Sequence, residues 1–96
     1  METMVDDDVC TFYADFDTHP DVVLAHIDVK KWSHNLYKNY YIPKWTEWLR
    51  LFREKGFHSV CAIIPSDDKK VSKFHGMMGM YEAYNDGVNR INRRWL

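Results

Sequence analysis

A short apolar segment in the second half of the chain limits the possible folds most strongly. Val60 to Ile64 reads Val-Cys-Ala-Ile-Ile, with Gly56 before it and Pro65 directly after it. Five apolar residues are too few for a stable isolated helix, whereas a strand covered on both faces has this composition. Such strands occur in parallel or mixed sheets with helices packed against them. The sequence therefore predicts a mixed α+β fold.

The size and composition of the chain predict one small domain. It has 96 residues, of which 46% are hydrophobic and 16% aromatic, and this composition is typical of a folded core and not of a disordered chain. The formal net charge of −1 gives no general attraction to nucleic acid or to an anionic membrane. Residues 1–96 are thus predicted to form a single domain that binds neither.

The cysteine pattern and the absence of long apolar segments indicate a compartment. Cys10 and Cys61 both lie in apolar segments, and we expect two buried thiols in a reducing environment rather than a disulfide framework. No apolar segment approaches the roughly 18 residues of a membrane span, and no secretory leader pattern is present. These features predict a cytoplasmic protein, or a protein of the host cytoplasm or the virion if the gene is viral.

Two segments near the N-terminus predict an antiparallel hairpin. Val9 to Phe16 and Val22 to Val29 alternate apolar with small or polar residues, and the five residues between them favour a turn. In the second segment one face is entirely apolar and should face the core. It carries Val23, Ala25, Ile27 and Val29. Residues 1–8 include three consecutive aspartates and are expected to form a flexible tail.

The segment from Lys30 to Tyr41 allows two interpretations. Ser33 can cap a helix, but the two asparagines of the segment are poor helix formers. In addition, the residue before Pro43 is pushed away from helical dihedral angles. Either a loop precedes a helix that begins at Pro43, or a longer helix is kinked there. The sequence favours the loop.

From Pro43 to Lys55 the pattern is that of an amphipathic helix. Proline suits the first turn of a helix, and Gly56 is a typical left-handed stop. Four large apolar residues recur at helical spacing: Trp45, Trp48, Leu49 and Phe52. At this spacing we expect them in the core, although a tryptophan pair can also serve as a stacking platform for a ligand.

A second helix and a second hairpin complete the predicted order. The turn Pro65-Ser66-Asp67-Asp68 offers several capping oxygens to a helix that runs to Met78 and ends at Gly79. An Asp-Gly turn then separates residues 80–85 from residues 88–95 and predicts a hairpin. The predicted order is β-β-α-β-α-β-β, with two helices packed on a mixed sheet.

The sequence lacks the patterns of a metal site or a hydrolase. None of the five histidines has a partner at H-x-x-x-H spacing, and neither a C-x-x-C pair nor a G-x-S-x-G elbow is present, so we expect no metal. Nucleic acid contact is possible only at the C-terminus, and it is the less favoured explanation of the basic residues there. They also protect an edge strand by charge. The residues are Arg90, Arg93 and Arg94, beside Trp95.

The order of these elements resembles the C-terminal two-thirds of the GNAT (Gcn5-related N-acetyltransferase) fold, over residues 9–95. The residues that carry the resemblance are Val29 at a strand end, Lys55-Gly56-Phe57 at a helix end, Ile64 at the next strand end, and Asp68-x-x-Val71-x-x-Phe74-His75-x-x-x-Gly79-Met80. The resemblance implies an acetyl-CoA-dependent enzyme or a descendant of one.

The resemblance also implies roles for individual residues. In the family, the backbone of the strand that here ends in Ile27, Asp28 and Val29 pairs with the pantetheine arm of acetyl-CoA. The tyrosine that commonly protonates the departing thiolate corresponds to His75, and a histidine with a pKa near neutrality can act as such an acid. His75 is therefore the candidate catalytic residue, and a helix residue without catalytic role is the alternative.

The phosphate loop of the family is not preserved. Its Arg/Gln-x-x-Gly-x-Gly/Ala pattern lets glycine backbones approach the pyrophosphate at a helix N-terminus. Residues 30–41 contain no glycine, so Lys30, Lys31 and Lys38 remain as candidate cofactor contacts through charge alone. The strand and two helices that begin a complete member are also absent, because only about eight residues precede the first predicted strand.

Two functions remain open at this point. Short GNAT-like proteins of this kind resemble products of tailed phages, some of which are described as head-assembly or internal virion proteins. The aromatic surface of this chain, with Trp32, Trp45, Trp48 and a run of tyrosines, exceeds what such a compact half can bury, so a protein partner or a homo-oligomer is expected. The chain is either an acyl-CoA-dependent N-acetyltransferase or a non-enzymatic binding or assembly module. The missing glycines and the missing N-terminal third favour the second.

Overall fold

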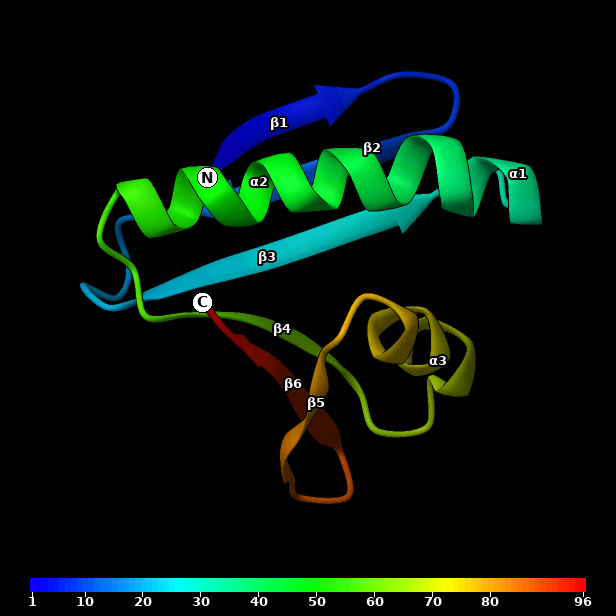
Figure 1. Ribbon diagram of the computed structural model, residues 1–96. Helices are drawn as coiled ribbons and strands as arrows, with labels where there is room; N and C mark the ends of the chain where they lie inside the picture. The colour runs from blue at the N-terminus through cyan, green and yellow to red at the C-terminus, as the bar shows by residue number, and fades with distance from the viewer.

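The sheet of this protein has six strands, one more than the sequence predicts. A computed structural model describes residues 1–96, with the strand order β1-β2-β3-β4-β6-β5 (Figure 1). The strands are β1 (Glu2–Asp6), β2 (Cys10–Asp15), β3 (Val22–Val29), β4 (Ser59–Pro65), β5 (Tyr81–Asn85) and β6 (Asn89–Trp95). The helical segments are α1 (His34–Leu36), η1 (Tyr37–Tyr41), α2 (Ile42–Glu54) and α3 (Lys69–Met77). The predicted mixed α+β class is confirmed.

One pair of neighbouring strands separates within the sheet. β3 and β4 run parallel, whereas all other neighbours run antiparallel. Their pairing covers three positions, from Val22 with Ser59 to Leu24 with Cys61. Beyond these positions the two strands diverge (Figure 1). Residues 25–29 of β3 therefore have no partner strand on the β4 side, and the sheet contains a wedge-shaped gap.

The prediction of a flexible N-terminal tail is wrong for Glu2–Asp6, because these residues form strand β1 and pair with β2. Asp7 builds the turn between these strands, because its Oδ1 accepts hydrogen bonds from the backbone N–H groups of Val9 and Cys10 at 2.8 and 3.0 Å. The Tyr40 hydroxyl donates to the other oxygen of Asp7. These hydrogen bonds lower the pKa of Asp7, that from Tyr40 most, and they join the turn to η1.

The predicted loop before Pro43 is also wrong, because the helix is continuous from His34 to Glu54. Ser33 caps its first turn, as the sequence suggested. In η1 the turn widens, and the N–H of Ile42 bonds to the carbonyl of Tyr37 five residues earlier. A proline within a helix lacks an N–H donor and clashes with the carbonyl four residues before it. The wide turn just before Pro43 relieves this conflict.

The core lies between the helices and one face of the sheet, and the predicted tryptophan stripe is part of it. The Trp48 ring stacks on Phe12 of β2, with 4.2 Å between ring centroids. The four predicted core residues of α2 are at most 8% exposed: Trp45, Trp48, Leu49 and Phe52. None of the helices combines the length and the apolar character that a membrane span requires.

The prediction that β4 is covered on both faces holds on one face only. Val60, Ala62 and Ile64 are buried on the side of the helices. Of the residues that point the other way, Cys61 is buried but Ile63 is 56% exposed. No helix covers that second face, because α2 and α3 both pack on the first.

Gly79 ends α3 in a position that only glycine suits. Its φ is +80°, and a Cβ atom there would collide with the Arg94 guanidinium, which crosses directly above it. Arg94 Nη1 also donates to the carbonyl of Met78 at 3.3 Å. The sharp turn from α3 into β5 therefore depends on the absence of a side chain.

We expect Gly79→Ala to lower the free energy of unfolding by about 1 to 3 kcal/mol, because alanine is strained at positive φ and would displace Arg94. Gly76→Ala is the matched control. Gly76 lies within α3 with open space around it, and alanine should stabilise the helix there by up to about 1 kcal/mol. Urea unfolding of both variants measures the difference. Equal effects of the two substitutions would contradict this account of the turn.

Candidate functional site

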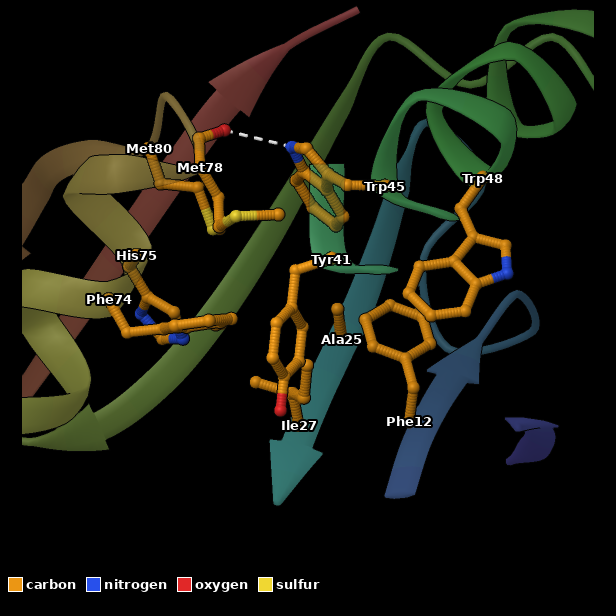
Figure 2. A pocket seen from close by; sticks show the side chains of 11 residues that line it. Phe12, Ala25, Ile27, Tyr41, Trp45, Trp48, Phe74, His75, Met78 and Met80 are labelled. Atoms are coloured by element: carbon orange, nitrogen blue, oxygen red, sulfur yellow. Dashed lines mark hydrogen bonds between the residues drawn. The ribbon is translucent and has the colours of Figure 1, made fainter. Parts of the chain in front are cut away.

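The gap between β3 and β4 holds a small, partly enclosed hollow on the side of the helices. Eleven residues line it, ten of them hydrophobic, and its free volume is about 20 Å³. This is room for roughly one water molecule. Side chains from β3, from the long helix and from α3 converge on it (Figure 2). Those discussed below are Ile27, Tyr41, Phe74 and His75.

Two aromatic side chains occupy most of the gap. The rings of Tyr41 and Phe74 meet edge to face with centroids 5.4 Å apart, and Figure 2 shows the Tyr41 ring between Phe74 and the strands. The Tyr41 hydroxyl donates to the carbonyl of Lys31 at 2.7 Å. Burial raises the pKa of Tyr41 to about 12. The phenol is thus a fixed, neutral part of the filling.

Trp32 closes the outer end of the gap. Its ring contacts those of Tyr37, Tyr41 and Phe74, with centroids 5.4 to 5.5 Å away. The side chain is 45% exposed, so it forms a boundary between the filled gap and solvent. Tyr37 strengthens the same closure, because its hydroxyl donates to the carbonyl of Met77 in α3 at 3.3 Å.

His75 lies inside the gap and is only 4% exposed. Arg90 Nε donates to Asn92 Oδ1 at 2.7 Å, which orients the amide so that Asn92 Nδ2 donates to His75 Nδ1 at 3.0 Å. The imidazole proton is therefore on Nε2. Burial, and secondarily the charge of Arg90, lower the pKa of His75 from 6.5 to about 4. The ring is neutral at pH 7, with about one molecule in a thousand protonated.

This pKa limits the chemistry available to His75. The predicted proton donor is an imidazolium, which needs a pKa near the operating pH. The buried ring instead offers a neutral Nε2–H, which is a hydrogen-bond donor but a very weak acid. Its catalytic role stays a prediction. Asn92 was not predicted as a site residue, and its only signal in the sequence is an amide between Arg90 and Arg93 in β6.

Ile27, Asp28 and Val29 lie where β3 has left β4. The last paired position is Leu24, so the backbone of these three residues has a free side toward the gap. The Ile27 side chain lines the hollow, whereas Asp28 is exposed on the opposite face of the sheet. The free strand edge is the feature that an extended ligand would pair with.

The three predicted lysines are not brought together as a phosphate site. Lys30 Nζ is 3.1 Å from Asp6 Oδ1, and Lys31 Nζ is 3.0 Å from Asp8 Oδ2. The hydrogen bond to Asp6 raises the pKa of Lys30. Lys38 is exposed on η1 and makes no ion pair. The turn between β1 and β2 thus supplies carboxylates to two of the three ammonium groups.

The fold itself has a known counterpart. It is similar to a crystal structure described as a "putative phosphinothricin N-acetyltransferase", with a TM-score of 0.61 and 20% sequence identity. The chain has a GNAT-like fold. The match covers 92% of this chain and 63% of the other, so this chain spans less than two thirds of that protein. No protein-family model and no curated protein matches the sequence.

The GNAT-like fold implies acetyl-CoA, but the residues of the gap do not fit it. A hollow of about 20 Å³ is far smaller than an acyl-pantetheine arm, and Trp32 lies across its entrance. The helix N-terminus is capped by Ser33 itself, and the segment that leads into it, residues 30–41, contains no glycine. Nor does the chain contain a group of three or more His, Cys, Asp or Glu side chains that could hold a metal ion.

The lowered pKa of His75 makes stability depend on pH. Between pH 6.5 and about 4 the unfolded chain binds a proton that the folded chain excludes, so the free energy of unfolding falls as the pH drops through this window. The full contribution, present above pH 6.5, is about 3 kcal/mol.

His75→Gln keeps an acceptor for Asn92 and cannot titrate. We expect a shallower decline for this variant in urea unfolding from pH 7 to pH 4.

The matched control is His58→Gln, a substitution of an exposed histidine before β4. It should keep the wild-type pH dependence. A His75→Gln variant that loses stability toward acid as steeply as the wild-type protein would show that the imidazole of His75 is not the titrating group.

Proposed function

We propose that this protein is a phage-encoded GNAT-fold module that has lost acyl transfer and acts by binding another protein in the host cytoplasm or the virion. The observation that carries the proposal is the filled gap. The GNAT resemblance places the pantetheine arm against the backbone at the end of β3, whose free side faces this gap. Here Tyr41 and Phe74 occupy that space, and Trp32 closes it.

Two further observations support the loss of catalysis. His75 has a pKa of about 4 and no charge at neutral pH, so it is poorly suited to protonate a thiolate. Lys30 and Lys31 are paired with carboxylates of the same chain, so a pyrophosphate would have to displace these contacts. His75 and two of the three predicted lysines thus meet competing interactions within the chain, whereas Lys38 and the free edge of β3 do not.

An acyl-CoA-dependent N-acetyltransferase is the second candidate. The free edge of β3 at Ile27, Asp28 and Val29 favours it, because this backbone is where the GNAT resemblance places the pantetheine arm. For this function Trp32 and Phe74 would have to move out of the gap. The neutral Nε2–H of His75 would then act as a hydrogen-bond donor in the opened site.

Calorimetric titration with acetyl-CoA and, separately, with CoA distinguishes the two functions. We expect no heat of binding and no thermal shift of the wild-type protein at millimolar ligand, because the gap is filled. Circular dichroism of the same sample confirms that it is folded. Micromolar binding of either ligand would overturn the proposal and direct attention to acceptor amines.

A substitution in the gap tests whether the filling is the cause. Phe74→Ala should open space beside Tyr41 and allow weak, millimolar binding of CoA that the wild-type protein lacks. Phe57→Ala is the control, because Phe57 is also a partly buried aromatic residue, packed on Phe16 away from the gap. Binding that is absent in both variants would show that the filling by Phe74 is not what excludes the cofactor.

A further inference from the structure

The face of the sheet that carries no helix, here called the open face, has two different halves. Cross-strand partners share a face, so the register places outward residues of β4, β6 and β5 together in an aromatic half. It consists of Ile63, Tyr81, Tyr84, Arg93 and Trp95.

The register of β2 with β3 and the parallel pairing of β3 with β4 place a second set on the same face. This acidic half consists of Tyr13, Leu24, His26 and Asp28.

The aromatic half is unusually exposed for its composition. Ile63, Tyr81, Tyr84 and Trp95 are 56%, 46%, 55% and 58% exposed. Adjacent large apolar side chains on a bare surface typically mark an interaction site. Tryptophan, tyrosine and arginine are also the residues that contribute most to protein interfaces. This half therefore has the composition of an interface centre.

Arg93 gives the aromatic half a positive charge that the chain does not neutralise. Its guanidinium lies 5.0 Å from the centroid of the Trp95 ring, and its Nε donates to Cys61 Sγ at 3.3 Å. It has no carboxylate partner among the ion pairs of the structure. The half thus presents aromatic rings around one cation held in place by the sheet.

The acidic half presents the complementary charge. Asp28 is exposed on β3 and has no ion-pair partner. Nearby, the rings of Tyr13 and His26 lie stacked with centroids 6.2 Å apart, and Leu24 is partly buried. These groups offer a carboxylate to a guanidinium, and flat rings to other aromatic side chains.

We propose that the open face binds a second copy of this chain, with the aromatic half of each copy against the acidic half of the other. This inference rests on the proposed binding function and names its partner. A two-fold symmetric interface needs complementary groups on one and the same surface, and the open face has them. Arg93 of one copy then faces Asp28 of the other, twice.

The shape of the molecule agrees with this mode of association. It measures 33 × 32 × 20 Å, as expected of one helical layer on one sheet. A face with these two long dimensions can supply the roughly 800 Å² per partner of a standard interface. Pairing through sheet edges is less suitable, because the edge strands β1 and β5 both contain a bulge, which disrupts the ladder.

Sedimentation equilibrium of the full chain between 1 and 100 µM, as approximate limits suited to typical interfaces, tests the inference. We expect a species of twice the 11.6 kDa monomer mass. Tyr84→Glu and Trp95→Glu should each raise the dissociation constant at least about tenfold, because each buries a charge in the interface. Val88→Glu is the control, since Val88 is 73% exposed in the hairpin loop. It should leave the dissociation constant unchanged.

A charge exchange provides the second test. Arg93→Glu and Asp28→Lys should each weaken the dimer, and the double variant should recover most of the lost affinity because the pair is restored in reverse. Recovery is a result that a merely damaged fold does not produce. A monomer at every concentration, a dimer insensitive to Tyr84→Glu, or a double variant weaker than both single variants would overturn the inference.

The titrations with acetyl-CoA keep this inference separate from the proposed function. A chain that is monomeric and binds no CoA would overturn the second-copy interface alone. A dimer that binds acetyl-CoA in the micromolar range would overturn the loss of acyl transfer alone.

Discussion

The separation of β3 from β4 is the constraint on which the rest of the structure depends. Two strands that part within a sheet leave free backbone groups and an apolar gap, and both are costly unless something occupies the space. This chain fills the gap with Tyr41 from the long helix and Phe74 from α3. The positions of the two helices, the wide turn that directs Tyr41 inward and the burial of His75 all follow from that filling.

The parts of the fold that depend on local chemistry could be predicted from the sequence. Gly56 and Gly79 end helices at positive φ, Asp68 caps α3, and the stripe of α2 is buried. Strand β1 could not be predicted, because it depends on pairing with β2 and on a turn in which Asp7 accepts a hydrogen bond from the distant Tyr40. The helix through Pro43 was missed because a wide turn, which no propensity encodes, removes the clash.

The structure brings His75 and Ile27 of β3 to one hollow, and their neighbourhood follows from the order of the elements. Their roles in binding or catalysis stay predictions. The protonation state of His75 depends instead on burial and on Asn92, seventeen positions later in the chain. The ion pairs of Lys30 and Lys31 likewise depend on Asp6 at the end of the unexpected strand and on Asp8 in the turn after it. A fold can therefore be retained while the groups that would perform its chemistry are held by contacts within the chain.

The wide turn η1 has a consequence for how such a protein can change during evolution. A π turn contains one residue more than an α-helical turn, so deleting a single residue there would leave the helix intact. The segment before the deletion would keep nearly its present orientation relative to α2, because the wide turn alone absorbs the change. A regular turn there would place Pro43 against the carbonyl four residues before it. The extra residue of η1 and Pro43 should therefore be gained or lost together in related chains.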